Sequence, residues 1–401
     1  MTRSQRDIVL LLTARALRGF GDGFAIIILP AYLAALGYDA AQIGLVATSA
    51  LLGTALLTLG IGFVAPRHDL RALLMASAGL MAATGLVFPQ FEHVGLVVAV
   101  AFIGTINPAT GDLGLIIPLE HTMLSQEAAD AERTRIFARY SLIGALAMAA
   151  GSLAAAAPDL LEGYGLSRIG AFKAMFYAYA VLGLANAALY ARLPRTKAEN
   201  RPPAAPLGPS RGRVYKLAAL FSLDAFAGGF IVQSLLAIWL FERFDMSLAA
   251  ASLFFFWTST LSAFSYPVAA WLSKRIGLIN TMVFTHIPSN ICLIVAAFSS
   301  NLYVALALLL IRAGLSQMDV PARSSYVMAV VTPAERPAAA SVTAVPRSLA
   351  SSVGPAMAGV MMNAGLLGLP LVVCGTLKTV YDLALLFTFR HIKPPEEREG
   401  R

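Results

Sequence analysis

The stretch RTKAENRPPAAPLGPSRGRVYK, residues 195–216, is the longest polar break in a chain of 401 residues that is 58% hydrophobic. Its prolines, charges and small residues are typical of a flexible linker. Six long apolar runs precede it and six follow it. The sequence therefore predicts two halves, residues 1–193 and 214–401, joined by a cytoplasmic linker over residues 194–213.

The apolar runs are long enough to cross a membrane as helices, which takes about 20 residues each. Only 13% of the residues are charged, against about 25% in soluble domains. We therefore expect an all-α membrane protein with twelve transmembrane helices in two six-helix bundles. The runs cover 8–36, 41–64, 71–90, 94–118, 136–157, 170–192, 214–240, 248–272, 278–299, 302–328, 338–362 and 367–390.

The distribution of lysine and arginine predicts the orientation, because cytoplasmic loops carry an excess of both. With the N terminus in the cytoplasm, cytoplasmic segments hold twenty of the thirty basic residues and outer loops hold three. We expect a multi-pass protein of the plasma membrane, the bacterial inner membrane, with both termini cytoplasmic. Basic tracts this short and scattered also argue against nucleic-acid binding, despite a net charge of +8.

The two halves show a weak internal repeat. GFAIIILPAYLAALGYDAA (23–41) aligns without gaps on GFIVQSLLAIWLFERFDMS (229–247), which places Asp39 on Asp245. The tripeptide AER occurs at 131–133 and again at 334–336. Such a repeat predicts bundles related by pseudo-symmetry.

Two short loops carry a family resemblance: GFVAPRHDLR (62–71) after the second run and WLSKRIG (271–277) after the eighth. They resemble the signature loop of the major facilitator superfamily, which has Gly, Asp-Arg, a second Gly and then basic residues. The positions that match are Gly62, Arg67, Arg71, Arg275 and Gly277. The positions that depart are Pro66, Asp69 and Lys274.

This resemblance extends over the whole chain and implies the two-bundle fold of secondary transporters. It also implies that these loop residues form a cytoplasmic gate, because arginines at helix ends can bond neighbouring carbonyls and carboxylates in one state and release them in another. The plainer alternative is anchoring of the loops by positive charge.

Two marks of the superfamily's drug–proton antiporters occur in the second half instead of the first. The eleventh run contains GPAMAG (354–359), and the tenth contains Arg312 and Gln317. Because these marks lie in the second half, they weaken the hypothesis of a drug–proton antiporter and leave the hypothesis of a transporter unchanged.

Charged side chains lie inside several runs, where each costs about 2.5–3.5 kcal/mol to insert. Arg15, Arg18 and Asp22 share one helical face in the first run, and Arg312, Asp319 and Arg323 share one in the tenth. The family resemblance implies that the first, fourth, seventh and tenth helices line a central cavity. The further cavity candidates are Asn107, Asp112, Asp224, Gln233, Gln317 and Arg347, and Glu120 and Arg139 join the gate candidates.

These charges allow a functional and a static interpretation. In the functional one, Asp22, Asp112, Asp224 or Asp319 binds a proton and the arginines bind an anionic substrate. In the static one, the charges form fixed ion pairs: Arg18 with Asp22, Asp319 with Arg323, and Lys378 with Asp382. Pro108 and Pro321 are expected to break their helices near these sites.

The leading hypothesis is a secondary transporter working by alternating access, with proton-coupled export of a small organic, amphiphilic, anionic or drug-like solute. The alternatives are a nutrient importer or uniporter and a lipid flippase of the same superfamily. No phosphate-binding Gly-Lys-Ser/Thr loop for ATP occurs, and His121 beside Glu120 is the only candidate for enzyme chemistry. We expect no enzyme activity, cofactor or metal, and a monomer whose partners are its solute, protons and the bilayer.

Overall fold

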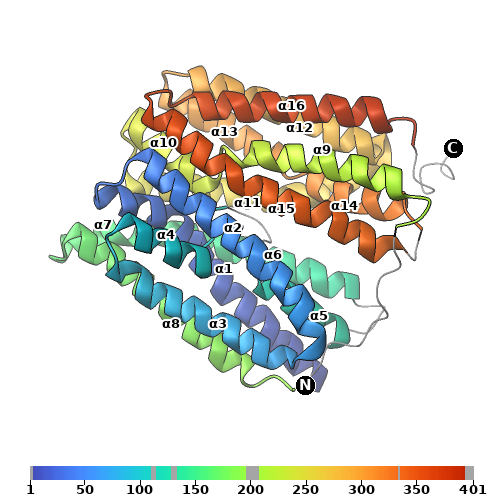
Figure 1. The fold of residues 1–401 in the computed structure, drawn as a ribbon. Helices are drawn as coiled ribbons and strands as arrows, with labels where there is room; N and C mark the ends of the chain where they lie inside the picture. The colour runs from blue at the N-terminus through green and yellow to red at the C-terminus, as the bar shows by residue number, and fades with distance from the viewer. Residues whose placement is uncertain (1–2, 110–113, 128–132, 196–206, 333–334, 393–401) are drawn as a thin grey trace. The chain divides into compact units, whose positions relative to one another are not determined.

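The computed structural model describes residues 3–109, 114–127, 133–195, 207–332 and 335–392. These residues are almost entirely helical, and no strand occurs among them (Figure 1). Ten helical segments within the described ranges are long and apolar enough to cross a membrane. The predicted all-α membrane fold is confirmed.

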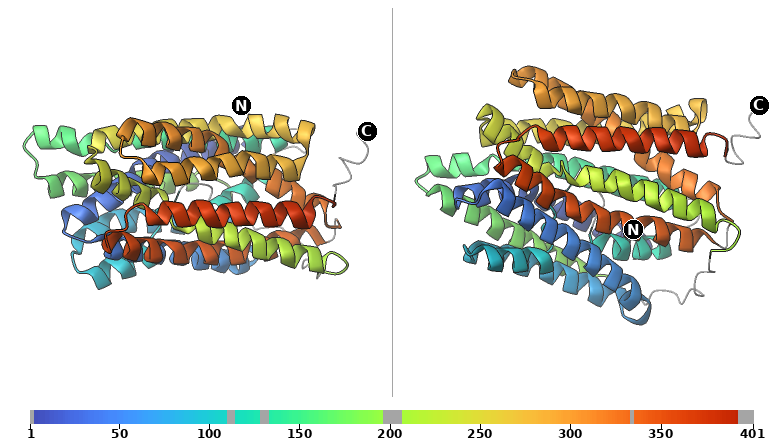
Figure 2. Two further views of the ribbon diagram at one scale, coloured as in Figure 1. Left: turned by 90° about the horizontal axis from the view of Figure 1, so that it is seen from above. Right: turned by 45° about the horizontal axis from the view of Figure 1, so that its top comes forward.

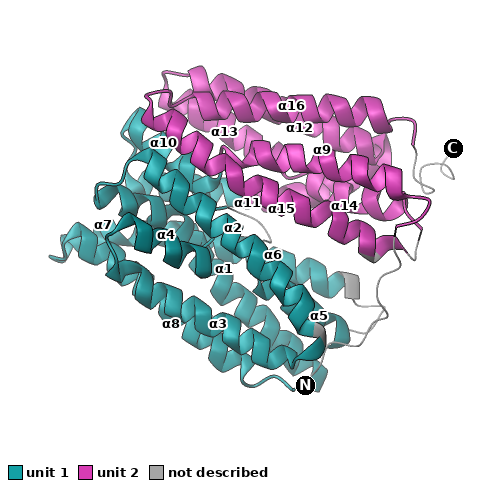
Figure 3. Cartoon of the chain, in the orientation of Figure 1, with its two compact units in different colours: residues 1–200, 232–259 teal, residues 201–231, 260–401 magenta. Residues whose placement is uncertain are grey.

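The chain forms two compact units, which Figure 3 colours separately. One unit consists of residues 1–200 and 232–259, and the other of residues 201–231 and 260–401. Residues 232–259 thus group with the first unit, although the polar linker precedes them. Residues 196–206 of the predicted linker lie outside the described part of the chain.

The first unit is built around α1, which packs against α6 and α8, while α3 packs against α8 and α2 against α4. Glycines permit these close approaches. The helices are α1 (Arg3–Ala35), α2 (Ala40–Val64), α3 (Leu70–Val87), α4 (Val94–Ile103), α5 (Ile116–Glu127), α6 (Arg133–Ala154), α7 (Ala157–Gly163), α8 (Arg168–Tyr190), α10 (Gln233–Phe244) and the start of α11 (Leu248–Ile276). Short 3₁₀ turns, Ala65–Arg67 and Phe88–Gln90, flank α3.

The second unit contains the rest of α11 with α9 (Arg211–Gly229), α12 (Leu278–Phe298), α13 (Leu302–Ser316), α14 (Asp319–Ala329), α15 (Arg336–Asn363) and α16 (Leu369–Phe389). Helix α9 packs against α15 and α16, and α12 packs against α13, α14 and α16. Both views of Figure 2 show α9, α15 and α16 side by side.

Three predicted runs are broken. Breaks in 94–118 and 302–328 are expected from Pro108 and Pro321, whereas the break in 214–240 corrects the expectation of a continuous helix there. The fourth run is interrupted between α4 and α5, around Pro108. The seventh breaks after Gly228 and Gly229, which have low helix propensity. The tenth breaks at Gln317 and Met318, because the ring of Pro321 would clash with the carbonyl of Gln317 in a continuous helix.

Candidate functional site

Asp22 lies in α1 and is held by a single phenol. The hydroxyl of Tyr179 on α8 donates to Asp22 Oδ1 at 3.3 Å, and the Tyr179 and Thr105 hydroxyls are 3.2 Å apart. Within the described residues Asp22 has no ion pair, so the predicted Arg18–Asp22 pair is wrong. Asp22 is therefore a partly buried carboxylate inside a membrane helix with no cation in contact.

Arg18 instead pairs with Glu120 of α5. Arg18 Nη2 is 2.5 Å from Glu120 Oε2, the Tyr140 hydroxyl donates to the same oxygen, and the Tyr190 hydroxyl donates to Oε1 at 2.7 Å. Glu120 is 0% exposed. Because every carboxylate oxygen has a partner, the cluster has the character of a fixed structural pair, and a gate role for Glu120 stays a prediction.

Two aromatic contacts surround this pair in the first unit. The Arg15 guanidinium lies over the ring of Tyr140, 5.1 Å from its centre. The His121 ring packs edge-on against Tyr140 at 4.9 Å. This packing places His121 between the rings of Phe137 and Tyr140.

The interrupted fourth run meets the start of α10 in the same unit. The Ser234 amide donates to the Pro108 carbonyl at 3.3 Å, and the Ala109 amide donates to Asn107 Oδ1 at 2.9 Å. Asn107 Nδ2 and Gln233 Oε1 are buried and have no hydrogen-bond partner among the described residues. Both amides belong to predicted cavity residues, and Asp112 lies outside the described residues.

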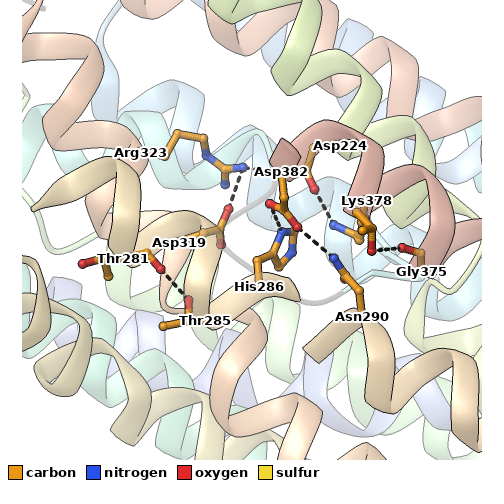
Figure 4. A network of polar contacts seen from close by, with 11 residues as sticks. Asp224, Thr281, Thr285, His286, Asn290, Asp319, Arg323, Gly375, Lys378 and Asp382 are labelled. Atoms are coloured by element: carbon orange, nitrogen blue, oxygen red, sulfur yellow. Dashed lines mark hydrogen bonds and ion pairs between the residues drawn. The ribbon is translucent and has the colours of Figure 1, made fainter. Parts of the chain in front are cut away.

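Asp224 stands at the centre of a charge network in the second unit (Figure 4). Its carboxylate contacts Lys378 Nζ of α16 at 2.6 Å and Arg323 Nη1 of α14 at 3.1 Å. Arg323 also pairs with Asp319 at 3.1 Å, as predicted. The predicted Lys378–Asp382 pair is wrong, since Lys378 reaches across to α9.

Asp382 has two partners on α12, which the sequence analysis overlooked. His286 Nδ1 lies 2.9 Å from Asp382 Oδ1, and Asn290 Nδ2 donates to Oδ2 at 2.9 Å (Figure 4). The signal was present in the sequence, because His286 and Asn290 stand one helical turn apart in an otherwise apolar run. Histidine counts as neutral in the formal charge, so considering charged residues alone overlooks His286.

Arg312 of α13 and Arg347 of α15 lack fixed counter-ions. For neither guanidinium does the described structure contain a hydrogen bond or ion pair, and the Nε atom of each is buried without a partner. Gln317, next to the α13 end, uses its backbone amide to cap that helix. Inside a membrane an unpaired guanidinium is costly, so the predicted anion-binding role of these arginines stays a prediction with a physical reason behind it.

Of the predicted gate residues, Gly62, Arg67 and Arg71 lie around the turn from α2 to α3, whereas Arg139 lies within α6. Gly62, Arg67 and Arg139 are exposed, and Arg71 is partly buried. Asp69 caps α3 by accepting from the Arg71 amide at 3.2 Å, so the departure from the signature has a structural use. None of Arg67, Arg71 or Arg139 has an ion pair among the described residues.

The corresponding turn of the second unit joins α11 to α12. The Arg275 guanidinium stacks on the Trp271 ring at 4.3 Å. Gly277 has φ 88°, a left-handed conformation that favours glycine. This geometry explains the glycine of the signature locally, and the gate role of both loops stays a prediction. The described residues contain no cluster of three or more His, Cys, Asp or Glu side chains suited to a metal ion.

Comparison with known proteins gives consistent matches over nearly the whole chain. A family model described as the Major Facilitator Superfamily matches residues 11–355 and 218–401. The chain is 23% identical to the uncharacterized membrane protein YJR124C of Saccharomyces cerevisiae, over 96% of this chain and 94% of that protein.

Proteins of known structure with the same fold are transporters of different solutes. The nucleoside transporter NupG is 15% identical, with a TM-score of 0.74 over 97% of this chain and 100% of that one. The xylose transporter XylE from E. coli is 13% identical, with a TM-score of 0.74 and coverage of 95% and 96%. The human organic anion transporter MFSD10 (TETRAN) is 14% identical, with a TM-score of 0.68 and coverage of 96% and 100%. At these identities the likeness shows the fold alone.

Proposed function

The chain belongs to the major facilitator superfamily, and from this premise we propose that it is a proton-coupled exporter of small organic anions, with Asp22 as its coupling residue. It is a multi-pass membrane protein of a transporter family. In the proposal it works by alternating access, both termini face the cytoplasm of a bacterial cell, and its partners are the solute, protons and the bilayer. It acts as a monomer and needs no cofactor.

The observation that carries the proposal is the contrast between Asp22 and the paired carboxylates. Asp22 has one phenol as its partner, whereas Glu120 has Arg18 and Asp224 has Lys378 and Arg323. A carboxylate without a contacting cation takes up a proton when water is excluded and releases it when water returns. This is the behaviour that coupling to alternating access requires.

The substrate class follows from the unpaired arginines. The guanidinium of Arg312 has five N–H donors and suits a carboxylate or phosphate group. Buried without a fixed counter-ion, it favours a ligand that brings negative charge.

The proposal is tested by proton release from the purified protein in detergent while a panel of small organic anions is added. We expect binding to release protons from the wild type and to release none from Asp22→Asn. Asp245→Asn is the matched control, because Asp245 is exposed and its left-handed backbone (φ 50°) accepts asparagine. Binding without proton release in the wild type would favour a uniporter and would contradict the proposal.

Arg312→Gln tests the substrate class separately. Loss of a charge-assisted hydrogen bond costs about 1.5–3 kcal/mol, or roughly a 10- to 150-fold increase in Kd. We expect this loss for anions and little change for neutral solutes, measured by titration calorimetry. Arg243→Gln, at an exposed position, should leave affinity unchanged, and equal loss in both variants would refute an anion site at Arg312.

A further inference from the structure

A second titratable pair lies in the second unit, on helices α12 and α16. His286 is 2% exposed and Asp382 is 0% exposed. The imidazole and the Asn290 amide contact different oxygens of the Asp382 carboxylate, both at 2.9 Å. Figure 4 shows the two α12 side chains converging on this one carboxylate.

The partners of Asp382 differ from those of the neighbouring acids. Asp224 and Asp319 are matched by Lys378 and Arg323, so the central network balances two carboxylates against two cations. Asp382 contacts only an imidazole and an amide. Since a buried carboxylate needs a counter-charge, His286 is the one described residue in direct contact that can supply it, by taking up a proton.

The other ionisable groups around the pair come from every helix that packs on α12 and α16. Arg347 acts on the network electrostatically without a contact, and the Tyr381 ring lies 6.1 Å from the His286 ring. The described groups linked electrostatically to the pair or to its neighbours are Asp224 of α9, Cys292 of α12, Arg312 of α13, Asp319 and Arg323 of α14, Arg347 of α15, and Cys374, Lys378 and Tyr381 of α16. None of these replaces His286 as the contact of Asp382.

We propose that His286 and Asp382 form a second proton-binding site, separate from Asp22, with Asn290 holding the carboxylate in place. The proton balance is simple. In the deprotonated state the neutral ring donates from Nδ1 to Asp382 Oδ1, and Nε2 carries a lone pair. One proton from water then binds Nε2, which converts a pair of charge −1 into a neutral imidazolium–carboxylate pair.

This site gives the second unit its own response to protons. Its part in transport rests on the proposed function, but its existence does not. As His286 charges, the field on Asp224, Lys378 and Arg323 changes, since all four groups lie close together (Figure 4). The ion pairs that tie α9 to α14 and α16 are thereby linked to the protonation of α12.

The test reads the protonation of His286 directly by ¹⁵N NMR of its ring in lipid nanodiscs. A chain with His68, His93, His121 and His391 each replaced by glutamine keeps only His286 and leaves the pair intact. We expect its Nε2 signal to change reversibly from N–H to bare nitrogen as pH is raised across the range over which the protein stays folded. No substrate is needed, so this result is independent of the proton-release measurement.

Asp382→Asn in the same background should leave the ring neutral over most of that range, because an amide does not stabilise an imidazolium. Asp245→Asn should leave the titration unchanged. One neutral tautomer throughout in the parent chain, or equal titration with and without Asp382, would overturn the proposal. If Asp382→Asn does not fold, the titration of the parent chain is the test. Infrared spectroscopy must then show that the Asp382 carboxylate is ionised at both the lowest and the highest pH.

Discussion

At the residue scale, the membrane carboxylates differ in what holds them. Asp22 has a phenol, Glu120 an arginine and two phenols, Asp224 two cations, and Asp382 an imidazole and an amide. Groups with permanent cations are fixed in charge, and groups without them can exchange protons. In the proposed function, this contrast is the reason for giving Glu120 a structural role and Asp22 the proton-coupling role.

The structural assignment of Glu120 predicts a large stability loss for Arg18→Met. Removing one partner of a buried pair leaves an unpaired charge and costs about 3–5 kcal/mol. We expect a clearly lower thermal midpoint in detergent, partly restored in the double variant Arg18→Met/Glu120→Gln. Arg139→Met, at an exposed position on α6, is the control. A single variant as stable as wild type would show that the pair is not structural.

Sequence reasoning placed these charges on helical faces but could not assign their partners. Spacing along one helix correctly groups Arg15, Arg18 and Asp22. An arginine side chain, however, can reach any adjacent helix. Arg18 pairs with Glu120, which lies 102 residues further along the chain. The local pair Asp319–Arg323 was predictable because both ends lie one turn apart.

At the element scale, close helix packing depends on glycines whose missing side chains admit a neighbouring backbone. A Cβ on Gly183 of α8 would lie 2.6 Å from the Ala82 amide nitrogen of α3, and one on Gly85 would lie 2.6 Å from the Phe176 carbonyl oxygen. Small residues play this role widely in membrane helices. The α3–α8 contact is therefore fixed by shape.

Gly183→Ala should consequently destabilise the protein by about 1–3 kcal/mol, the usual cost of overpacking. Gly79→Ala is the matched control, since α3 has open space at Gly79, and there alanine should be neutral or stabilising by up to about 1 kcal/mol. Thermal unfolding in detergent measures both. Equal effects at the two positions would argue against shape-driven packing of α3 on α8.

Glu335 ties the described start of the second unit to the α14–α15 turn. Its carboxylate accepts from the amides of Gly208 at 2.6 Å and Ser210 at 3.3 Å, and from the Thr332 hydroxyl at 2.7 Å. Because these donors, Thr332 first, favour the ionised form, the pKa of Glu335 falls to about 2. The carboxylate lies outside the spanning segments and fixes the chain as it enters α9.

This lowered pKa predicts a pH dependence of stability. A folded-state pKa of about 2, below an unfolded value near 4.3, means that the stabilisation is complete above about pH 4.3 and is lost as pH falls toward 2. Glu335→Gln should therefore lower the thermal midpoint at pH 7, and its difference from wild type should shrink below about pH 4. A constant difference across this range would show that ionisation of Glu335 is not involved.

Hydropathy located the helical runs but not their interruptions. The break at Gln317 has a readable cause in Pro321, four residues on. The interruption around Pro108 is likewise expected from that proline, whereas the one after Gly229 lies in a segment that stays apolar, so composition alone continues the helix through it. A break in a helix frees backbone amides and carbonyls, which then need other hydrogen-bond partners. The Ser234 amide is such a partner for the Pro108 carbonyl, and a single sequence does not reveal this contact.

At the scale of the whole molecule, the fold follows from hydropathy, the internal repeat and the signature loops together. The fold does not identify the solute, because proteins with this fold include a nucleoside transporter, a xylose transporter and an organic anion transporter. Buried side chains without partners are therefore the better guide to the substrate.

The positive-inside distribution predicts that both termini face the cytoplasm. A green fluorescent protein fused at the C terminus should fluoresce in bacterial cells, and alkaline phosphatase inserted at Gly165, between α7 and α8, should be active. Alkaline phosphatase at the C terminus is the reciprocal control and should be inactive. The opposite pattern would invert the topology and with it the proposed direction of transport.

The most direct measurement of the central claim is proton movement in proteoliposomes that contain a pH-sensitive dye and an organic anion gradient. In the wild type, protons should move in the direction opposite to the anion flux. In Asp22→Asn, proton movement should fall to the level of empty liposomes, while exchange of anion for anion should continue. Asp245→Asn should behave as wild type. Proton movement that survives in Asp22→Asn would contradict the assignment of coupling to this residue.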